Sequence, residues 1–267
     1  MIANTAKGKI EFTSVGSGLP ILFVHGGHGN CNETLFHKGY DTNRFHLITP
    51  SRPGYGQTPL AISSPKETAA LFVSLLDELK IEMVIAIGIS AGGLTAIELA
   101  ANYPNRVSKL ILISAVTKRW LSIDDAMYKK GRKIFKPSIE KYSWPLFKFF
   151  YFMFPNRMAK VMFKELSTVG RFDITKEEVK ELQMMIGKQR SFQGFVNDLD
   201  QTIHEGTISK IICPTLMLHS TNDNVVKIEH AIHAQHTIKN SILKLYNTNG
   251  GICSGLEMKV QIQSTMR

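Results

Sequence analysis

The hydrophobic positions of the chain alternate between two spacings. Short apolar runs recur, and between them lie longer segments whose apolar residues repeat every three to four positions. The segment that begins near Ser64 and Pro65 is a clear helix start, since Ser is a favoured N-cap and Pro fits the first turn. We expect strands at residues 10–13, 21–24, 45–49, 83–87, 110–114, 215–219 and 242–246, and further helices at 94–103 and 228–238. This alternation predicts an α/β fold with a mainly parallel central sheet flanked by helices.

Between residues 117 and 206 the strand signals disappear, and long helical segments rich in aromatic and basic residues replace them. The simplest interpretation is a helical cap of residues 117–206 inserted into a core of residues 1–116 and 207–267. Such a cap would lie over the carboxyl ends of the strands, where ligands bind in open α/β sheets.

The most informative motif is Gly88-Ile89-Ser90-Ala91-Gly92, which directly follows one expected strand and directly precedes a helix. This is the G-x-S-x-G pattern in its required strand–turn–helix context. The turn is so tight that the residues two before and two after the serine must be small. Gly88 and Gly92 satisfy this need, and the motif predicts a nucleophile elbow that presents the Ser90 hydroxyl at a helix N-terminus.

A second glycine-rich segment, His25-Gly26-Gly27-His28-Gly29, follows an earlier strand. With this segment the chain resembles the α/β-hydrolase superfamily from strand 21–24 through Tyr246. The resemblance implies a serine hydrolase of the esterase or lipase type, whose oxyanion hole would be the backbone N–H groups of Gly27 and Ala91. It also implies that His25 is structural.

Members of this superfamily place an acid after the strand that follows the cap, and a histidine after the last strand. In the segment His219-Ser220-Thr221-Asn222-Asp223 the resemblance makes Asp223 the acid, although it could also serve as a helix cap. The loop after the last strand contains Gly250-Gly251-Ile252, so isoleucine stands where the family has histidine. Isoleucine cannot accept a proton from Ser90, and we therefore expect little activity on ordinary esters.

Other histidines are poor substitutes for the missing base. His230, His233 and His236 fall on the helix before the last strand, whereas His28 and His219 could approach from other loops. A structural role is the better explanation for both.

The genetic code suggests a cause. Isoleucine codons begin A-T, so one extra C before codon 252 gives histidine, and the shifted frame can continue Leu-Phe-Trp-Phe-Gly-Asn-Glu. The present tail, residues 253–267, has no convincing helical period. Our hypothesis is a one-base frameshift, by gene decay or by sequencing error.

The segment 142–154 contains eight aromatic residues, too many on all sides for an ordinary amphipathic helix. It could roof a pocket for an apolar or aromatic group of a small-molecule substrate, pack the cap on the core, or touch a membrane surface beside its basic residues. The net charge of +10 comes without a nucleic-acid motif, so no nucleic-acid partner is expected.

The remaining composition narrows the class of protein. No apolar run reaches the roughly 18 residues of a membrane-spanning helix, and residues 1–9 do not resemble a secretory signal, so we expect a cytoplasmic protein. The three cysteines lack metal-site spacing, and neither a metal nor a cofactor is predicted. Three functions remain open: a hydrolase with impaired activity, a protein that keeps the pocket and binds a small ligand without turnover, and a structural or interaction protein whose basic cap binds anionic partners.

Overall fold

The computed structural model describes residues 1–33, 35–169 and 174–247. Eight strands form one sheet in the order β1-β2-β4-β3-β5-β6-β7-β8. The first two, β1 (Ile2–Thr5) and β2 (Gly8–Gly16), form a hairpin, and β2 is antiparallel to β4 (Phe45–Pro50). The other neighbours pair in parallel: β3 (Leu19–Val24), β5 (Val84–Ile89), β6 (Val107–Ile113), β7 (Thr215–Ser220) and β8 (Ser241–Tyr246). The predicted mainly parallel sheet is therefore confirmed.

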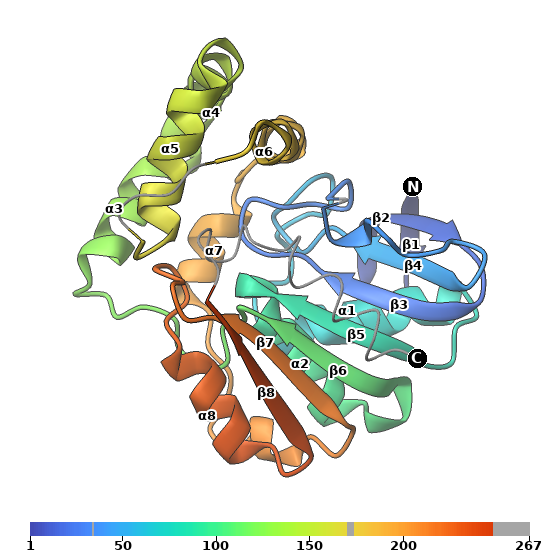
Figure 1. Cartoon of the computed structure of the whole chain (residues 1–267). Coiled ribbons are helices and arrows are strands. Elements are labelled where there is room, and N and C mark those ends of the chain that lie inside the picture. Colours follow the sequence, from blue (N-terminus) through green and yellow to red (C-terminus); the bar gives the residue numbers. More distant parts are fainter. Residues whose placement is uncertain (34, 170–173, 248–267) are drawn as a thin grey trace.

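One face of this sheet is covered by α1 (Pro65–Glu78), α2 (Gly93–Asn102) and α8 (Glu229–Thr237) (Figure 1). Helix α1 begins as predicted, because Ser64 and Glu67 form a capping box ahead of Pro65. The central strand β5 is buried along its whole length, as expected for a strand covered on both faces.

The opposite face of the sheet carries a second apolar cluster, which includes Ile21, Ile87 and Leu216. Among the described residues outside the sheet, the hydrophobic side chains packed against this cluster are Phe36 and Tyr40, and the His37 ring contacts Phe23 at 4.6 Å. Phe36 belongs to a short 3-10 turn, Leu35–His37. Thus no described α-helix covers this face.

Between β6 and β7 the described chain contains helices and no strands. They are α3 (Ala126–Ile134), α4 (Pro137–Met153), α5 (Pro155–Leu166), α6 (Lys176–Lys188) and α7 (Gly194–Asp200). Helices α4 and α5 form an arm that stands away from the sheet, whereas α7 lies close to it (Figure 1). These helices fall within the segment predicted as a cap. The structure adds one strand that the sequence analysis missed, β1, which is short and half-exposed.

Candidate active site

Ser90 lies at the sharp turn between β5 and α2, on the short 3-10 segment Ser90–Gly92. Its φ of 49° is in the left-handed region, which costs energy for a residue with a side chain. Glycine is required two residues later, because a Cβ on Gly92 would lie 2.3 Å from the backbone oxygen of Val24. Gly88 is similarly tight against Ala96, at 2.7 Å. The strand–turn–helix layout around Ser90 is therefore the one that the motif predicts.

The loop after β3 passes directly beside Ser90. A Cβ on Gly26 would lie 3.0 Å from the Ser90 Cβ and 3.7 Å from its Oγ. Only a residue without a side chain allows the backbone to approach the serine this closely. The structure therefore brings the His25–Gly29 segment and the Gly88–Gly92 segment together.

A buried network fixes the orientation of this loop. The Arg52 side chain donates to the backbone oxygens of His25 (2.9 Å) and Gly26 (3.1 Å), and His25 Nδ1 donates to the same Gly26 oxygen (2.8 Å). The backbone N–H of Arg52 donates to His25 Nε2 at 2.9 Å, which sets the tautomer of the ring. His25 is thus a structural residue. Because C=O and N–H point in opposite directions across a trans peptide, the N–H of Gly27 points away from Arg52.

The arginine is held in turn by a residue of α7. Arg52 Nη1 and Nη2 bind the two carboxylate oxygens of Asp198 at 2.6 and 2.7 Å, and Tyr55 Oη donates to the same carboxylate at 2.6 Å. Arg52 and Asp198 are 2% and 3% exposed. The sequence analysis missed this pair. Arg52 lies in the segment Pro50-Ser51-Arg52-Pro53-Gly54-Tyr55-Gly56, whose composition indicates only turns, and nothing in the sequence links it to a carboxylate 146 positions away.

Asp223 lies in the loop after β7 and is 4% exposed. Its Oδ1 accepts the backbone N–H groups of Val225 and Val226, both at 2.9 Å. Its Oδ2 has no hydrogen-bond partner among the described residues. The nearby Ser114 hydroxyl favours the charged carboxylate but stands outside hydrogen-bond geometry. Burial nevertheless raises the pKa of Asp223 above its ordinary value, so one oxygen is left both desolvated and unpaired.

The other histidines near the site are engaged elsewhere. His28 Nδ1 is 2.6 Å from Ser191 Oγ, and His219 Nε2 donates to the Val226 oxygen at 2.9 Å. His230 and His233 both contact Thr117 through Nδ1, at 3.2 Å. The position where the family has histidine, Ile252, lies outside the described residues, as do Gly250 and Gly251.

Aromatic residues of the helices between β6 and β7 surround His28, next to Gly27. Its ring stacks on Phe195 at 4.0 Å and lies 4.6 Å from Phe135 and 5.2 Å from Trp144. Loss of hydration, together with the charge of Arg52, lowers the pKa of His28 to about 3, so the ring is neutral at pH 7. Phe195 also closes over Gly27, where a Cβ would lie 2.9 Å from the ring.

The aromatic segment 142–154 is divided between several environments. Trp144 faces His28 and donates its indole N–H to the Gln189 oxygen at 2.9 Å. Phe147 and Tyr151 pack inside the helical layer, in a cluster with α5 and α6. The other aromatics of the segment are 42–70% exposed, namely Tyr142, Phe149, Phe150, Phe152 and Phe154. These five exposed side chains are therefore not accounted for by packing within the helices or by a pocket roof.

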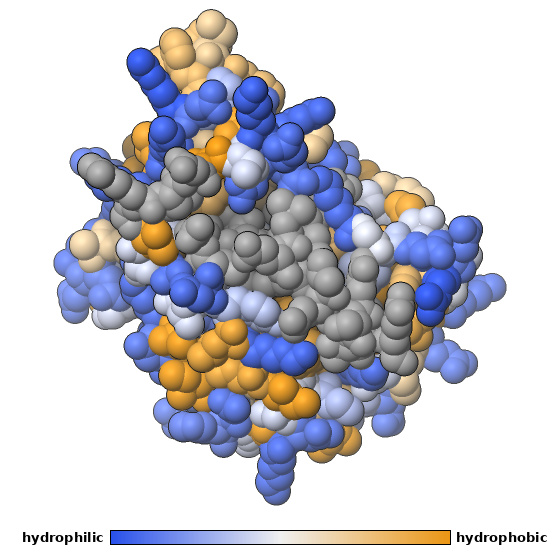
Figure 2. All heavy atoms as spheres, in the orientation of Figure 1, coloured by the Kyte–Doolittle hydropathy of each residue, from blue (hydrophilic) through white to orange (hydrophobic). Residues whose placement is uncertain are grey.

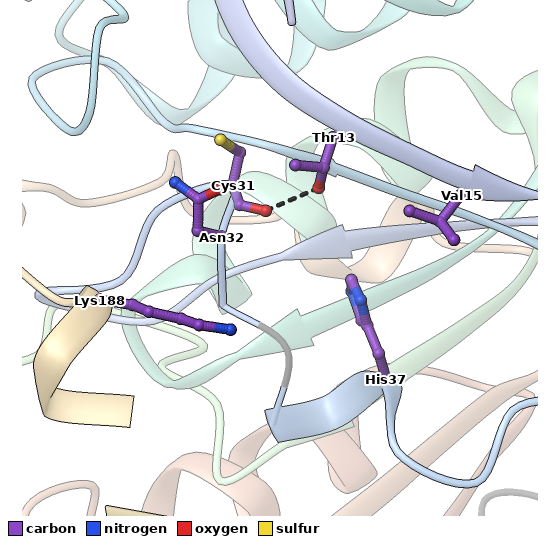
Figure 3. A pocket seen from close by; sticks show the side chains of 6 residues that line it. All are labelled: Thr13, Val15, Cys31, Asn32, His37 and Lys188. Atoms are coloured by element: carbon purple, nitrogen blue, oxygen red, sulfur yellow. Dashed lines mark hydrogen bonds between the residues drawn. The ribbon is translucent and has the colours of Figure 1, made fainter. Parts of the chain in front are cut away.

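A separate hollow of about 270 Å³ lies beside β2 and the end of α6 (Figure 3). The side chains that line it are Thr13, Val15, Cys31, Asn32, His37 and Lys188. Thr13 Oγ1 donates to the Cys31 oxygen there, at 2.6 Å. The lining includes neither Ser90 nor Asp223, so this hollow is distinct from the candidate active site.

Among the described residues, no cluster of three or more His, Cys, Asp or Glu side chains could hold a metal ion. None of the helices formed by residues 1–33, 35–169 and 174–247 is long and apolar enough to cross a membrane.

Comparison with known proteins decides the family. The model of the alpha/beta hydrolase fold family matches residues 20–251. The chain belongs to the α/β-hydrolase family. It is 39% identical over 250 residues to the uncharacterized hydrolase YcgS of Bacillus subtilis (strain 168), with 91% of this chain and 88% of that protein covered.

Solved structures agree on the fold of this α/β hydrolase. An alpha/beta hydrolase fold protein from Nakamurella multipartita is 23% identical with a TM-score of 0.78, covering 98% of this chain and 96% of that one. The esterase EaEST from Exiguobacterium antarcticum is 20% identical with a TM-score of 0.74, covering 100% and 97%. The family and fold predicted from the sequence are thus confirmed.

Proposed function

We propose that this α/β hydrolase belongs to the carboxylic-ester type, with Ser90 as nucleophile and Asp223 as acid, and that the chain as written lacks its general base. The proposed oxyanion hole consists of the N–H groups of Gly27 and Ala91. The proposed substrate is a small molecule with an apolar or aromatic group, which would lie under Trp144 and Phe195. The similarity to an esterase fold and to a bacterial hydrolase supports this reaction class.

The observation that carries the proposal is the unpaired Oδ2 of Asp223. A buried carboxylate oxygen without a donor is destabilising, and native sites rarely leave one unsatisfied. In a serine-hydrolase triad this oxygen accepts the Nδ1–H of the catalytic histidine, which fixes its tautomer. The site therefore keeps an acceptor whose donor is absent from the described residues.

With histidine at position 252 the reaction would follow the triad mechanism. The imidazole takes the Ser90 proton while Oγ attacks the carbonyl carbon, and the N–H groups of Gly27 and Ala91 hold the oxyanion. The imidazolium then protonates the leaving alcohol. Water, activated by the same ring, releases the acid and restores Ser90. Without the base, turnover is expected to fall by a factor on the order of 10⁶.

Two further observations support the frameshift hypothesis. The family match ends at residue 251, immediately before Ile252. The sheet face that carries Ile21, Ile87 and Leu216 has no α-helix from the described residues on it, and such an apolar face is normally covered by helices in α/β folds. The shifted frame would supply the histidine in the loop after the last strand and, behind that loop, the start of a terminal helix that could cover this face.

The test compares three forms of the full chain: as written, with Ile252→His, and with the shifted-frame sequence from position 252 onward. Hydrolysis of p-nitrophenyl acetate and butyrate and labelling of Ser90 by a fluorophosphonate are measured, with Ser90→Ala as control. We expect the chain as written to be nearly inert and the shifted-frame form to gain at least about 10³-fold. Rapid Ser90-dependent hydrolysis by the chain as written would overturn the proposal. Tight binding of an ester without turnover in all three forms would instead indicate a ligand-binding protein.

A further inference from the structure

The outer face of α4 carries an apolar stripe that no other described helix or strand covers. Its members follow one another at intervals of three and four residues, so they lie on one side of the helix. The stripe consists of Ile139, which is 42% exposed, Tyr142, which is 70% exposed, and Leu146, Phe149 and Met153, each 57% exposed. At the outer end of the arm the stripe continues into Phe152, Phe154 and Val161, which are 48–57% exposed.

This exposure is not needed for the packing of the arm. The inner face of α4 has its own contacts, since Trp144 lies against His28 and Tyr151 is fully buried with Phe163 and Ile186. The arm projects from the rest of the molecule, and apolar side chains gather at its outer end, with hydrophilic side chains around them (Figures 1 and 2). A contiguous exposed apolar surface of this kind marks a site of interaction.

The charge around the stripe is strongly positive. Residues 132–166 contain eight Lys or Arg and two Glu. One of these acids, Glu140, is 2% exposed and pairs with Arg190, and the other, Glu165, pairs with Lys130 at 3.1 Å. Lys141, Arg157, Lys160 and Lys164 are all exposed. A partner that lies on the arm formed by α4 and α5 therefore meets exposed basic side chains on both helices.

We propose that α4 docks the protein on an anionic lipid surface. An amphipathic helix that lies in the plane of a membrane combines an apolar face with flanking Lys and Arg, and Tyr, Trp and Phe favour the interface. A second copy of the chain fits less well, because it would bring the same positive charges together. Seams between paired helices are also usually built from Leu, Ile and Val, whereas four of the eight exposed residues of the stripe and its continuation are Tyr or Phe.

The geometry matches a surface contact. Helix α4 has 17 residues, about 25 Å of helix, and its exposed side chains lie along its length. The arm stands clear of the sheet, so the stripe could reach a flat surface without displacing the helices beside Ser90 (Figure 1). The proposal does not depend on the catalytic state of the site.

Vesicle flotation with the full chain tests the proposal. Vesicles of phosphatidylcholine alone are compared with vesicles of phosphatidylcholine and phosphatidylglycerol in equal parts, at low and high salt. We expect binding to the anionic vesicles only, weakened by salt. The double variant Leu146→Ser with Phe149→Ser should lower the binding by about tenfold or more, because two large side chains no longer leave water.

A matched control is Ile212→Ser, which removes an apolar side chain that is 71% exposed but distant in the sequence from α4. It should bind as the parent does. Since all three positions are exposed, the variants should fold, and thermal melts verify this. Absence of binding to anionic vesicles would overturn the proposal. A dimer in gel filtration that the double variant dissociates would instead identify a second copy as the partner.

Discussion

The buried Arg52–Asp198 pair provides a quantitative test of the structure. In the variant Asp198→Ala the guanidinium of Arg52 remains buried and loses both of its bonds to a carboxylate, at 2.6 and 2.7 Å. The Tyr55 hydroxyl loses its acceptor as well. Since Arg52 is only 2% exposed, water cannot replace the carboxylate without opening the contact between α7 and the loop beside Ser90.

The size of the effect follows from this burial. Removing one partner of a buried ion pair costs about 3–5 kcal/mol, because an uncompensated charge is left inside. At about 2 °C per kcal/mol for a chain of this length, Tm should fall by about 6–10 °C.

Asp200→Ala is the matched control, on the last turn of the same helix. Asp200 pairs with Arg132 at 2.5 Å and accepts the Tyr128 hydroxyl at 2.6 Å, but the side chains of the ion pair are about half exposed, at 51% and 45%. An exposed pair contributes about 0–1 kcal/mol and the hydroxyl bond about 1 kcal/mol, so the loss of both should lower Tm by about 4 °C or less.

Differential scanning calorimetry at one pH and salt concentration measures both variants. A third form, Arg52→Met with Asp198→Leu, removes both charges and should melt above Asp198→Ala, because no buried charge remains unpaired. Equal losses of Tm in Asp198→Ala and Asp200→Ala would refute the reasoning. A double variant that melts below the single one would show that the bonds from Arg52 to the loop, rather than the buried charge, dominate.

Two other predictions concern stability. Acid should destabilise the fold: burial lowers the pKa of His37 and His230 to about 4, so between pH 6.5 and 4 the unfolded chain binds protons that the folded chain does not. The urea concentration at the midpoint of unfolding should therefore fall as the pH is lowered over that range, although Asp223 contributes in the opposite direction. The variant His37→Gln should reduce this fall, and midpoints that do not change with pH would contradict the prediction. Gly92→Ala should cost more than about 3 kcal/mol, because its Cβ would lie 2.3 Å from the Val24 oxygen. Gly187→Ala on α6, whose Cβ would lie 3.5 Å from Phe152, should change stability by no more than about 1 kcal/mol, so similar melting curves for both would argue against this packing.

Strand β1, which the sequence did not predict, shows the limit of prediction from hydrophobic patterning. Its four residues are partly or fully exposed, and Ile2 is 45% exposed, so no apolar run marks them. The strand forms because its backbone pairs with residues 8–11 of β2. That pairing is a contact between segments, which periodicity along the chain does not record.

The amino-acid sequence alone determined the α/β class, the parallel sheet and the place of Ser90. These features depend on interactions within a few residues: apolar runs, a capping box, and small residues at a sharp turn. Tertiary structure alone decided that Arg52 meets Asp198, that one oxygen of Asp223 is unpaired, and that the stripe on α4 faces outward. Each of these depends on which distant segments exclude water from a side chain, and a linear pattern does not contain that information.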